Sequence, residues 1–561
     1  MATNRRDFLR AIGLAGAASF AFARGFTTPD LLHAATRADD DDSGASRLRK
    51  AKQIRDRASA LAFRRRMPTQ KPNGEEKDYP YIATFTKGLP HNDLGEVDKR
   101  AYKKLLKALT SQKQRDFENI ETGDKRLKNP MAGLTYHLEG PDPQQLALPA
   151  APRIDEPENS AEMGELYWQA LCRDIPFLEY ENSATISEAI DDLSRFTRYK
   201  GPKAGSSITP SVIFRGTSDG CLVGPYISQF LWLDVPMGVR TLPGQLSSGT
   251  LSQRYRTTLG GTDYLTSYAF WQHRNSGGLD GNTPQYDSGT FYIRNGRDLA
   301  GAVQIDIPFQ SAVNAAYIIL SLGIPYGSGN PYRSSLTMDP FSTFGYPHVV
   351  CLVGEAALHA AHAVWYQKWF VHRRLRPETF AARIYNHLRG AANYSMIDSE
   401  ILNSNVLPKI ADYNLSLNGL GESTYLLPQA YPEGAPLHPA YASGHAAMIG
   451  AAVTVLKAFF DESFAFPNPV VTNSDGTALL PYSGTDASLM TVGGELNKLA
   501  YNIAMGRNWA GIHWRTDASE GLKLGETVAI RLLKELSLTF PEKHSYSLTT
   551  FTGKRITIRK R

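Results

Sequence analysis

Seven residues in three separate stretches of the chain have the chemistry to hold a highly charged oxyanion. The most informative stretch is Ser443-Gly444-His445, because a serine before an apolar run of helical periodicity is a typical helix N-cap and glycine permits close backbone approach. Free N–H groups and the positive end of the helix dipole attract anions at such a position. The other two stretches add cations and a second histidine, which gives the full set Lys368, Arg376, Ser443, Gly444, His445, Arg507 and His513.

The second stretch, KWFVHRRLRP, places Lys368 and Arg376 at the end of an apolar run over residues 349–371. The run predicts one long, largely buried helix, and the proline that follows Arg376 predicts where the chain leaves helical geometry. Basic residues at the end of a helix are also typical of solvated cations that the helix dipole favours. We interpret Arg373 and Arg374 in that way.

The third stretch, GRNWAGIHWRTD, contains Arg507, His513 and Asp517 and opens a run through Leu532 that predicts another core helix. His513 and Asp517 are four residues apart, so on a helix they would share a face. A carboxylate in that place fixes the tautomer of an imidazole and leaves the other ring nitrogen free to bind. The alternative is a solvent-exposed His/Asp pair on a helix surface.

Together these residues supply what one tetrahedral oxyanion requires. The three cations neutralise its charge, the Ser443 hydroxyl and the Gly444 amide orient its oxygens, and one histidine binds or attacks its central atom. The other histidine is then free for proton transfer.

The three stretches resemble the motifs of the vanadium-dependent haloperoxidases, within the superfamily that these share with the type 2 phosphatidic acid phosphatases. The resemblance is best to the bromoperoxidase branch and extends to two upstream blocks, NPMAGLTYHLEGPD at residues 129–142 and GELYWQALCRD at residues 164–174. It covers roughly residues 80 to 540.

Two features depart from the wider superfamily pattern. The spacing between Lys368 and Arg376 is one residue longer than in acid phosphatases and chloroperoxidases, although it suits bromoperoxidases. Ala442 replaces the proline that usually precedes Ser-Gly-His. Neither departure removes a predicted ligand.

The resemblance implies a role for each residue. His513 is expected to be the axial ligand of vanadium(V), and His445 the acid–base residue that accepts a proton from hydrogen peroxide. Lys368 is also expected to act in catalysis by polarising the bound peroxide, and His438 to tune halide oxidation from the halide side. The residues expected to hydrogen-bond the vanadate oxygens are Lys368, Arg376, Ser443, Gly444 and Arg507.

The implied protein is a vanadate-dependent bromoperoxidase that oxidises bromide and iodide with hydrogen peroxide to hypohalous acid. The acid is expected to halogenate small organic compounds without a specific pocket for them. Two alternatives stay open. An acid phosphatase of the same superfamily would use His513 as nucleophile and His445 as acid. An exported phosphate- or vanadate-binding protein would use the cations and amides but would need no proton shuttle.

Long apolar helices with candidate residues at their ends predict a mainly α fold, in which helix bundles pack side by side around the pocket. The resemblance implies two packed four-helix bundles of vanadium haloperoxidase type, long wrapping loops and assembly into a homo-oligomer. Further helices are predicted over residues 96–109 and 162–171. Gly/Ser/Pro-rich pieces at residues 238–249 and 323–331 predict long connections.

Residues 1–23 resemble a twin-arginine export signal, because Arg5-Arg6 precedes the apolar run AIGLAGAASFAFA and Ala21-Phe22-Ala23 offers a cleavage site. A mitochondrial presequence or a short membrane anchor is the alternative, but the run is short for a span of about 20 residues. The expected location is therefore periplasmic or secreted, with no stable membrane anchor. Residues 24–80 are expected to form a polar lead-in, and residues 81–561 the haloperoxidase-like helical domain.

Composition and charge limit which classes of protein and which kinds of site the chain can contain. A chain of 561 residues with 42% hydrophobic content has enough apolar surface for a large core. The net charge of +6 is modest, and no Lys/Arg stripe alternates with aromatic residues, so no nucleic-acid partner is expected. Cys172, Cys221 and Cys351 lack CxxC spacing, which gives no support for a zinc knuckle and allows at most one disulfide.

Overall fold

The computed structural model describes residues 44–237, 249–279, 281–419 and 421–560. The chain divides into two compact units, Met1–Arg64 and Arg65–Arg561. The described part of the first unit is helix α3 (Gly44–Phe63), none of whose residues is buried. The predicted export signal over residues 1–23 lies outside the described residues.

The larger unit begins at Arg65, within the segment that we expected to be a polar lead-in. Two acidic side chains tie the end of this segment to the rest of the unit. The buried Glu75 carboxylate accepts a hydrogen bond from the Ile154 backbone N–H at 2.7 Å. Glu76 forms an ion pair with Arg373 at 2.8 Å.

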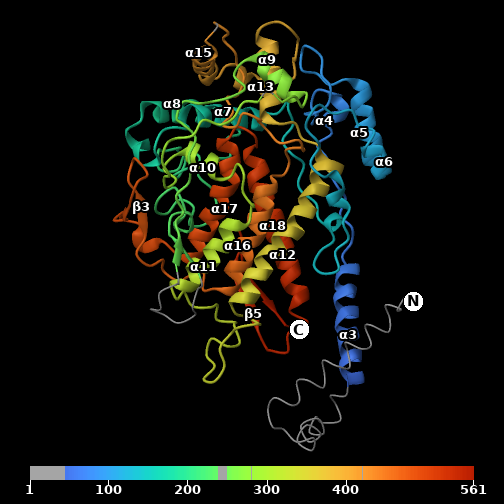
Figure 1. Cartoon of the computed structure of the whole chain (residues 1–561), viewed down its shortest axis with the longest axis vertical. Coiled ribbons are helices and arrows are strands. Elements are labelled where there is room, and N and C mark those ends of the chain that lie inside the picture. The colour runs from blue at the N-terminus through green and yellow to red at the C-terminus, as the bar shows by residue number, and fades with distance from the viewer. Residues whose placement is uncertain (1–43, 238–248, 280, 420, 561) are drawn as a thin grey trace, which may run out of the picture. The chain divides into compact units, whose positions relative to one another are not determined.

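The larger unit is mainly α-helical, as the sequence predicts (Figure 1). Its α-helices are α4 (Glu75–Asp78), α5 (Lys99–Ser111), α6 (Gln114–Phe117), α7 (Pro157–Cys172), α8 (Ala184–Leu193), α9 (Tyr268–Asn275), α10 (Gly296–Ala302), α11 (Gln310–Ser321), α12 (Tyr346–Tyr366), α13 (Pro377–Leu388), α14 (Ser399–Leu402), α15 (Val406–Asn418), α16 (Gly444–Phe459), α17 (Val492–Trp509) and α18 (Arg515–Leu536). The helices predicted over residues 96–109 and 162–171 correspond to α5 and α7.

The strands are short and form two-stranded antiparallel sheets outside the helical core. They are β1 (Val235–Met237) with β2 (Gly249–Leu251), β3 (Val470–Thr472) with β4 (Leu479–Pro481), and β5 (Ser545–Thr549) with β6 (Arg555–Arg559). Short 3₁₀ segments are η2 (Pro130–Leu134), η3 (Pro143–Gln145), η4 (Phe177–Asn182), η5 (Gln229–Leu231) and η7 (Ala487–Leu489).

Two groups of helices make up the core. Helices α12, α16, α17 and α18 lie side by side at the centre of Figure 1, and α16 packs against each of the other three. In the second group, α7 packs against α8, α14 and α15. Helix α16 is buried over almost its whole length, because most of its residues are Ala, Gly, Val, Ile, Leu, Met or Phe.

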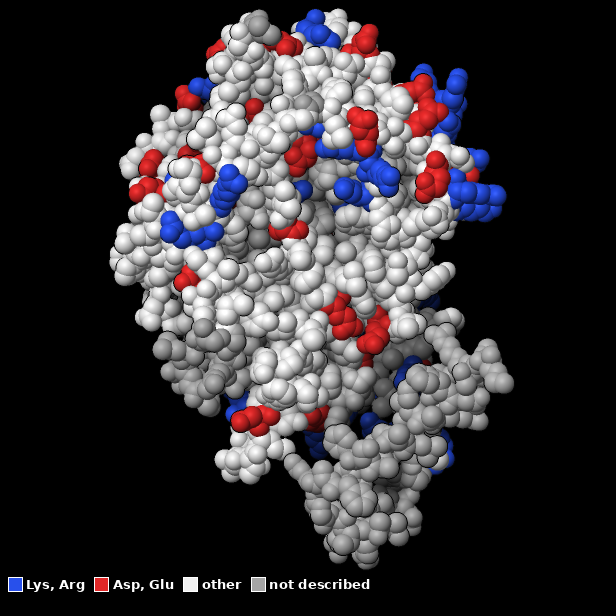
Figure 2. Space-filling view, viewed as in Figure 1, with Lys and Arg blue, Asp and Glu red and all other residues white. Residues whose placement is uncertain are grey.

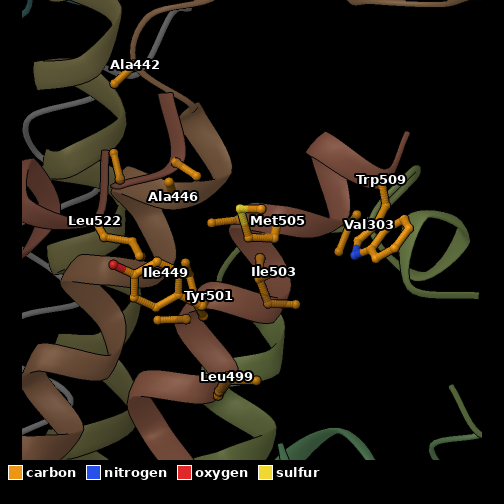
Figure 3. Close-up of a cluster of buried hydrophobic side chains, with 14 of the residues drawn as sticks. Val303, Ala442, Ala446, Ile449, Leu499, Tyr501, Ile503, Met505, Trp509 and Leu522 are labelled. Atoms are coloured by element: carbon orange, nitrogen blue, oxygen red, sulfur yellow. The ribbon is translucent and has the colours of Figure 1, made fainter. Parts of the chain in front are cut away.

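Glycines let α16 and α18 approach closely. A Cβ at Gly521 would lie 2.7 Å from the Cβ of Ala446, and a Cβ at Gly450 would lie 2.6 Å from the backbone oxygen of Leu522. Figure 3 shows Ala446, Ile449 and Leu522 gathered at this contact. The contact matters for the site because the N-terminus of α16 and the turn before α18 both carry predicted site residues.

The long helix predicted over residues 349–371 is present, but its last turn is not α-helical. Helix α12 ends at Tyr366 and continues as a π-helical segment, η6 (Gln367–His372). Helix α13 then begins at Pro377, with Arg376 as its N-cap residue. π-Helical turns are rare in proteins, and those that occur are often found at functional sites. This one carries Lys368.

All three cysteines are free; Cys172 and Cys221 are buried and Cys351 is exposed. One helical stretch, Tyr346–Leu388, is long and apolar enough to cross a membrane by length and composition. Its first part, α12, packs against α16 and α18, and a buried core helix meets the same criterion. Figure 2 shows Lys and Arg interspersed with Asp and Glu on the visible face.

Candidate active site

The N-terminus of α16 supplies a hydroxyl and backbone amides to the site. Ser443 is the N-cap residue, and its side chain accepts from the Ala446 N–H at 3.5 Å, as the sequence predicts. Its own N–H donates to the backbone oxygen of Asp517 at 2.9 Å, which ties this end of α16 to α18. Ser443 is fully buried.

Lys368 reaches from the π-helical segment to the loop that precedes Ser443. Its Nζ donates to the backbone oxygens of Pro439 and Ala440 at 2.7 and 2.8 Å. The side chain is fully buried. Burial, with the positive charge of Arg376 as the next cause, holds the pKa of Lys368 well below its usual value.

Arg376 contacts two imidazoles. Its Nη1 lies 3.0 Å from Nε2 of His513, and its Nη2 lies 2.9 Å from Nδ1 of His438. Burial lowers the pKa of Arg376 to about 9. Because a guanidinium can only donate, Nε2 of His513 accepts this hydrogen bond and its lone pair carries no proton.

The opposite nitrogen of His513 is held by Asp517. Nδ1 lies 2.7 Å from Oδ2 of Asp517, which also accepts from the Trp514 backbone N–H at 3.1 Å. The predicted His/Asp contact is therefore present, but not on one helix face: His513 lies in the turn between α17 and α18, and Asp517 lies in the first turn of α18. Nδ1–H donates to the carboxylate, and Nε2 faces the cations.

Arg507 lies near the end of α17. Its Nη1 donates to the backbone oxygen of Val303 at 2.5 Å, and its guanidinium lies 5.4 Å from the ring centroid of Tyr431. Its Nε is buried and has no hydrogen-bond partner within the described part of the chain. Burial is the largest cause of the lowered pKa of Lys368, Arg376 and His513, and the positive charge of Arg507 is a smaller cause of each shift. Arg507 therefore belongs to the same cluster of charges.

His445 also contacts a carboxylate, and this one comes from a distant segment of the chain. Its Nε2 lies 2.8 Å from Oδ1 of Asp306, in the loop between α10 and α11. Burial, followed by Arg507, lowers the pKa of His445, and Asp306 opposes this shift. Burial raises the pKa of Asp306, but His445 and Arg507 outweigh it and hold that pKa below its usual value.

His438 completes the cluster. Its ring centroid lies 6.5 Å from that of His513 and 5.0 Å from that of Trp365. Burial, followed by Lys368 and Arg376, holds the pKa of His438 well below its usual value. His438 is therefore a neutral imidazole beside the cations.

Two arginines that we expected to be solvated are not. Arg374 is 2% exposed and forms ion pairs with Glu162 at 2.7 Å and with Asp517 Oδ1 at 3.0 Å. Arg373 is largely buried and is paired with Glu76. The prediction for these residues was wrong because their carboxylate partners come from distant parts of the chain.

The structure thus brings all the predicted site residues to one region, where positive charge is in excess. Within the described residues, none of Lys368, Arg376 and Arg507 forms an ion pair with a carboxylate. Buried cations without such partners are costly unless an anion compensates them. The described residues contain no group of three or more His, Cys, Asp or Glu side chains that could hold a bare metal ion.

Comparison with known proteins defines the class. The family described as VCPO second helical-bundle domain matches residues 348–540, which include α16, α17, α18 and all but the first two residues of α12. A homohexameric vanadate-dependent bromoperoxidase from Ascophyllum nodosum superposes with a TM-score of 0.86 at 28% identity, covering 93% of this chain and 92% of that one. The fold is that of the vanadium haloperoxidases.

The relatives narrow the class further. The vanadium-dependent bromoperoxidase of Corallina pilulifera is 34% identical over 92% of this chain and 99% of its own length. The vanadium-dependent bromoperoxidase of Ascophyllum nodosum is 34% identical over 92% of each chain. The chain belongs to the vanadium-dependent bromoperoxidase family, whose members are peroxidases with a vanadate cofactor.

Vanadate fits the donor set of this site. Nε2 of His513 is unprotonated and lies beside Arg376, the charges of Lys368 and Arg507 also act on this imidazole, and within the described residues Nε of Arg507 lacks an acceptor. Two further residues support this set: Asp306 beside His445, which the sequence analysis missed, and Arg374 beside Asp517, which it took for a solvated cation. Asp306 stands between two isoleucines, and a single acidic residue in an apolar context is a local sign of a special role. Nothing in the sequence links it to His445, however.

Proposed function

We propose that this enzyme oxidises bromide, and also iodide, with hydrogen peroxide to hypohalous acid, which then halogenates small organic compounds. The observation that carries the proposal is the convergence of Lys368, Arg376 and Arg507, all buried, on a histidine whose Nε2 is unprotonated. A vanadate bound there acts as a Lewis acid that activates peroxide. Bromide specificity is supported by the bromoperoxidase relatives.

His513 would bond vanadium through Nε2, since Asp517 holds the proton on Nδ1. The Ser443 hydroxyl, the Gly444 amide and the cations would hydrogen-bond the oxygens and balance their charge. Lys368 would also polarise the bound peroxide, because its ammonium is buried beside the site and any charge that develops there is poorly screened. The full set of proposed cofactor contacts is Lys368, Arg376, Ser443, Gly444, Arg507 and His513.

His445 would move the proton. It is supported as the base because its lowered pKa keeps it neutral at pH 7, and Asp306 lies where it can stabilise the protonated form. His438, neutral and hydrogen-bonded by Arg376, would tune halide oxidation from the other side.

Two parallel assays test the proposal. After reconstitution with orthovanadate, bromination of a phenol is expected only when vanadate, bromide and peroxide are all present. Hydrolysis of an aryl phosphate is measured on the same preparation without vanadate. Rapid ester hydrolysis without any bromination would identify a phosphatase that uses His513 as nucleophile. Vanadate binding without turnover in either assay would identify a binding protein.

We further propose export through a twin-arginine signal at residues 1–23 and a periplasmic or secreted location, with no stable membrane anchor, on the basis of Arg5-Arg6 and the apolar run after it. Homo-oligomer formation is supported by the homohexameric Ascophyllum nodosum structure. Replacing Arg5-Arg6 by Lys-Lys should keep the protein inside the cell, and cell fractionation measures this. Unchanged export of that variant would contradict the signal assignment.

A further inference from the structure

A pocket of about 210 Å³ lies directly behind the carboxylate that contacts His445. Asp306 forms part of the wall of this pocket, and its Oδ1 lies 2.8 Å from Nε2 of His445. A molecule in the pocket would therefore be separated from the acid–base residue by one side chain.

The inner wall of the pocket is apolar and buried. It is formed by fully buried side chains from η5, α10 and α17 and from the strand-like segment before α10: Leu231, Ile293, Leu299 and Ile503. Figure 3 shows Ile503 among the packed side chains of α17. Apolar cavities on the order of 150 Å³ hold a benzene molecule, so this one has room for a substituted benzene.

The pocket also contains polar groups that could hydrogen-bond one hydroxyl of a ligand. The Ser311 hydroxyl is a buried atom with no hydrogen-bond partner in the described part of the chain. Asn314 lines the same wall of α11. The pocket thus combines an apolar inner wall with polar side chains from α11, and such a combination suits a small organic ligand that carries a polar substituent.

The mouth of the pocket faces solvent. Ile305 is 89% exposed and Ile307 is 56% exposed, and these two residues flank Asp306. An apolar rim at an open mouth favours entry of an uncharged organic molecule. The exposed Arg256 lies at the same rim.

We infer that this pocket binds the organic halogen acceptor, a small neutral aromatic such as a phenol, beside the site where hypohalous acid forms. The inference rests on the proposed function and contrasts with our expectation that the acceptor has no specific pocket. In the reaction, π electrons of the ring form the carbon–bromine bond, and the bromine–oxygen bond of hypobromous acid breaks with its electron pair going to oxygen. The ring carbon then loses its proton, and water is the second product.

Gly301 provides a variant that fills the pocket. It lines the pocket, and a Cβ added there would meet no atom within 4 Å, so Gly301→Phe can place a ring in the cavity without a backbone clash. The matched control is Gly260→Phe, at an exposed glycine that does not line the pocket and whose nearest neighbour would be 3.7 Å away. Ser311→Ala is a milder second variant that removes the hydroxyl.

Three measurements on the vanadate-loaded enzyme separate the outcomes. Calorimetry with phenol should show saturable binding to the wild type and to Gly260→Phe, and at least tenfold weaker binding to Gly301→Phe. The KM for phenol bromination should rise by the same factor. Triiodide formation from iodide and peroxide needs no organic acceptor, so it should be unchanged in all variants.

Phenol binding and bromination that are equal in Gly301→Phe and the wild type would overturn the inference. So would bromination that stays proportional to phenol concentration with no saturation in the wild type. If triiodide formation fails in the wild type, the proposed function fails, and the calorimetric comparison still decides whether the pocket binds phenol. If Gly301→Phe does not fold, a weaker phenol affinity of Ser311→Ala supports the inference and an unchanged one opposes it.

Discussion

At the scale of single residues, the site depends on how each imidazole is held. His513 keeps its proton on Nδ1 because Asp517 accepts it, and Asp517 is in turn held by Arg374. His445 contacts Asp306, and the charge of Arg507 also acts on it. In the proposed function, these two histidines would take different tasks, His513 as the ligand and His445 as the proton carrier.

Replacing Asp517 by Asn should weaken vanadate binding. The substitution keeps the size of the side chain but removes the charge that fixes the Nδ1 proton of His513 at 2.7 Å. Loss of such a supporting carboxylate typically lowers metal affinity by about 10- to 100-fold. The measurement is the vanadate dissociation constant at pH 7.

The matched control is Glu520→Gln, a carboxylate of the same helix that pairs with Lys523. It should leave the vanadate affinity unchanged. Arg374→Gln should act in the same direction as Asp517→Asn, because Arg374 donates to the other carboxylate oxygen. Equal affinities of wild type and Asp517→Asn would show that the carboxylate does not position the ligand.

Replacing Asp306 by Asn should change the pH dependence of peroxide turnover. Asp306 stabilises the protonated form of His445, whereas Arg507 and burial destabilise it. Without the carboxylate the pKa of His445 falls further, so the base stays neutral to lower pH. The acid limb of the kcat/KM profile for hydrogen peroxide should therefore move to lower pH.

The control for this profile is Asp475→Asn, at an exposed aspartate whose side chain accepts from Thr477 and which lies outside the site. Its acid limb should coincide with that of the wild type. A shift of the Asp306→Asn limb to higher pH would contradict the role given to the carboxylate.

The motif residues and the contact between His513 and Asp517 could be predicted from the sequence, but the partners that come from distant segments could not. Lys368, Ser443 and His513 stand in short patterns whose chemistry is readable from neighbouring residues. Asp306 meets His445 across 139 positions, and Arg374 meets Asp517 across 143. Such pairings follow from tertiary packing, which local sequence does not encode.

At the scale of elements, the site is built on helix ends. Lys368 lies in the π-helical segment after α12, Arg507 at the end of α17, and Ser443 at the start of α16. The existence of these helices follows from apolar periodicity. The π-helical segment does not, because its altered hydrogen bonding is set by how the side chains around it pack.

Replacing Gly521 by Ala should destabilise the core. The added Cβ would lie 2.7 Å from the Cβ of Ala446 and would force α16 and α18 apart. Overpacking of this kind lowers the free energy of unfolding by about 1 to 3 kcal/mol. Urea unfolding measures the change. Vanadate affinity should fall as well, since the two helices carry opposite sides of the site.

Gly354→Ala in α12 is the matched control, because its Cβ would meet its nearest neighbour, Phe309, at 3.6 Å. Where there is space for the added Cβ, a Gly→Ala change in a helix raises the free energy of unfolding by up to about 1 kcal/mol. If both variants had the same stability, the close approach of α16 and α18 would not depend on Gly521.

At the scale of the whole molecule, the mainly α fold could be predicted, whereas the course of its long connections could not. Three large apolar side chains on such connections are almost fully exposed: Tyr136 (87%), Leu138 (102%) and Leu336 (99%). Single exposed apolar residues are common on monomers, but large exposed groups are also typical of subunit interfaces.

We expect the protein to sediment as a homo-oligomer, at a multiple of the 61.9 kDa chain mass. The double variant Leu138→Asp/Leu336→Asp should shift the distribution toward smaller species, because charges at a buried interface are unfavourable. Analytical ultracentrifugation measures both. A wild type that sediments as a monomer at micromolar concentration would contradict the expectation.

The most direct test of the account is vanadium bound per chain in the wild type and in His513→Ala, measured by metal analysis after equilibrium dialysis against orthovanadate. Because Asp517 holds the proton of His513 on Nδ1 and leaves Nε2 unprotonated beside buried cations, the wild type should retain one vanadium per chain and lose it on substitution. Retention of one vanadium by His513→Ala, with bromination unchanged, would place the cofactor elsewhere and contradict the account.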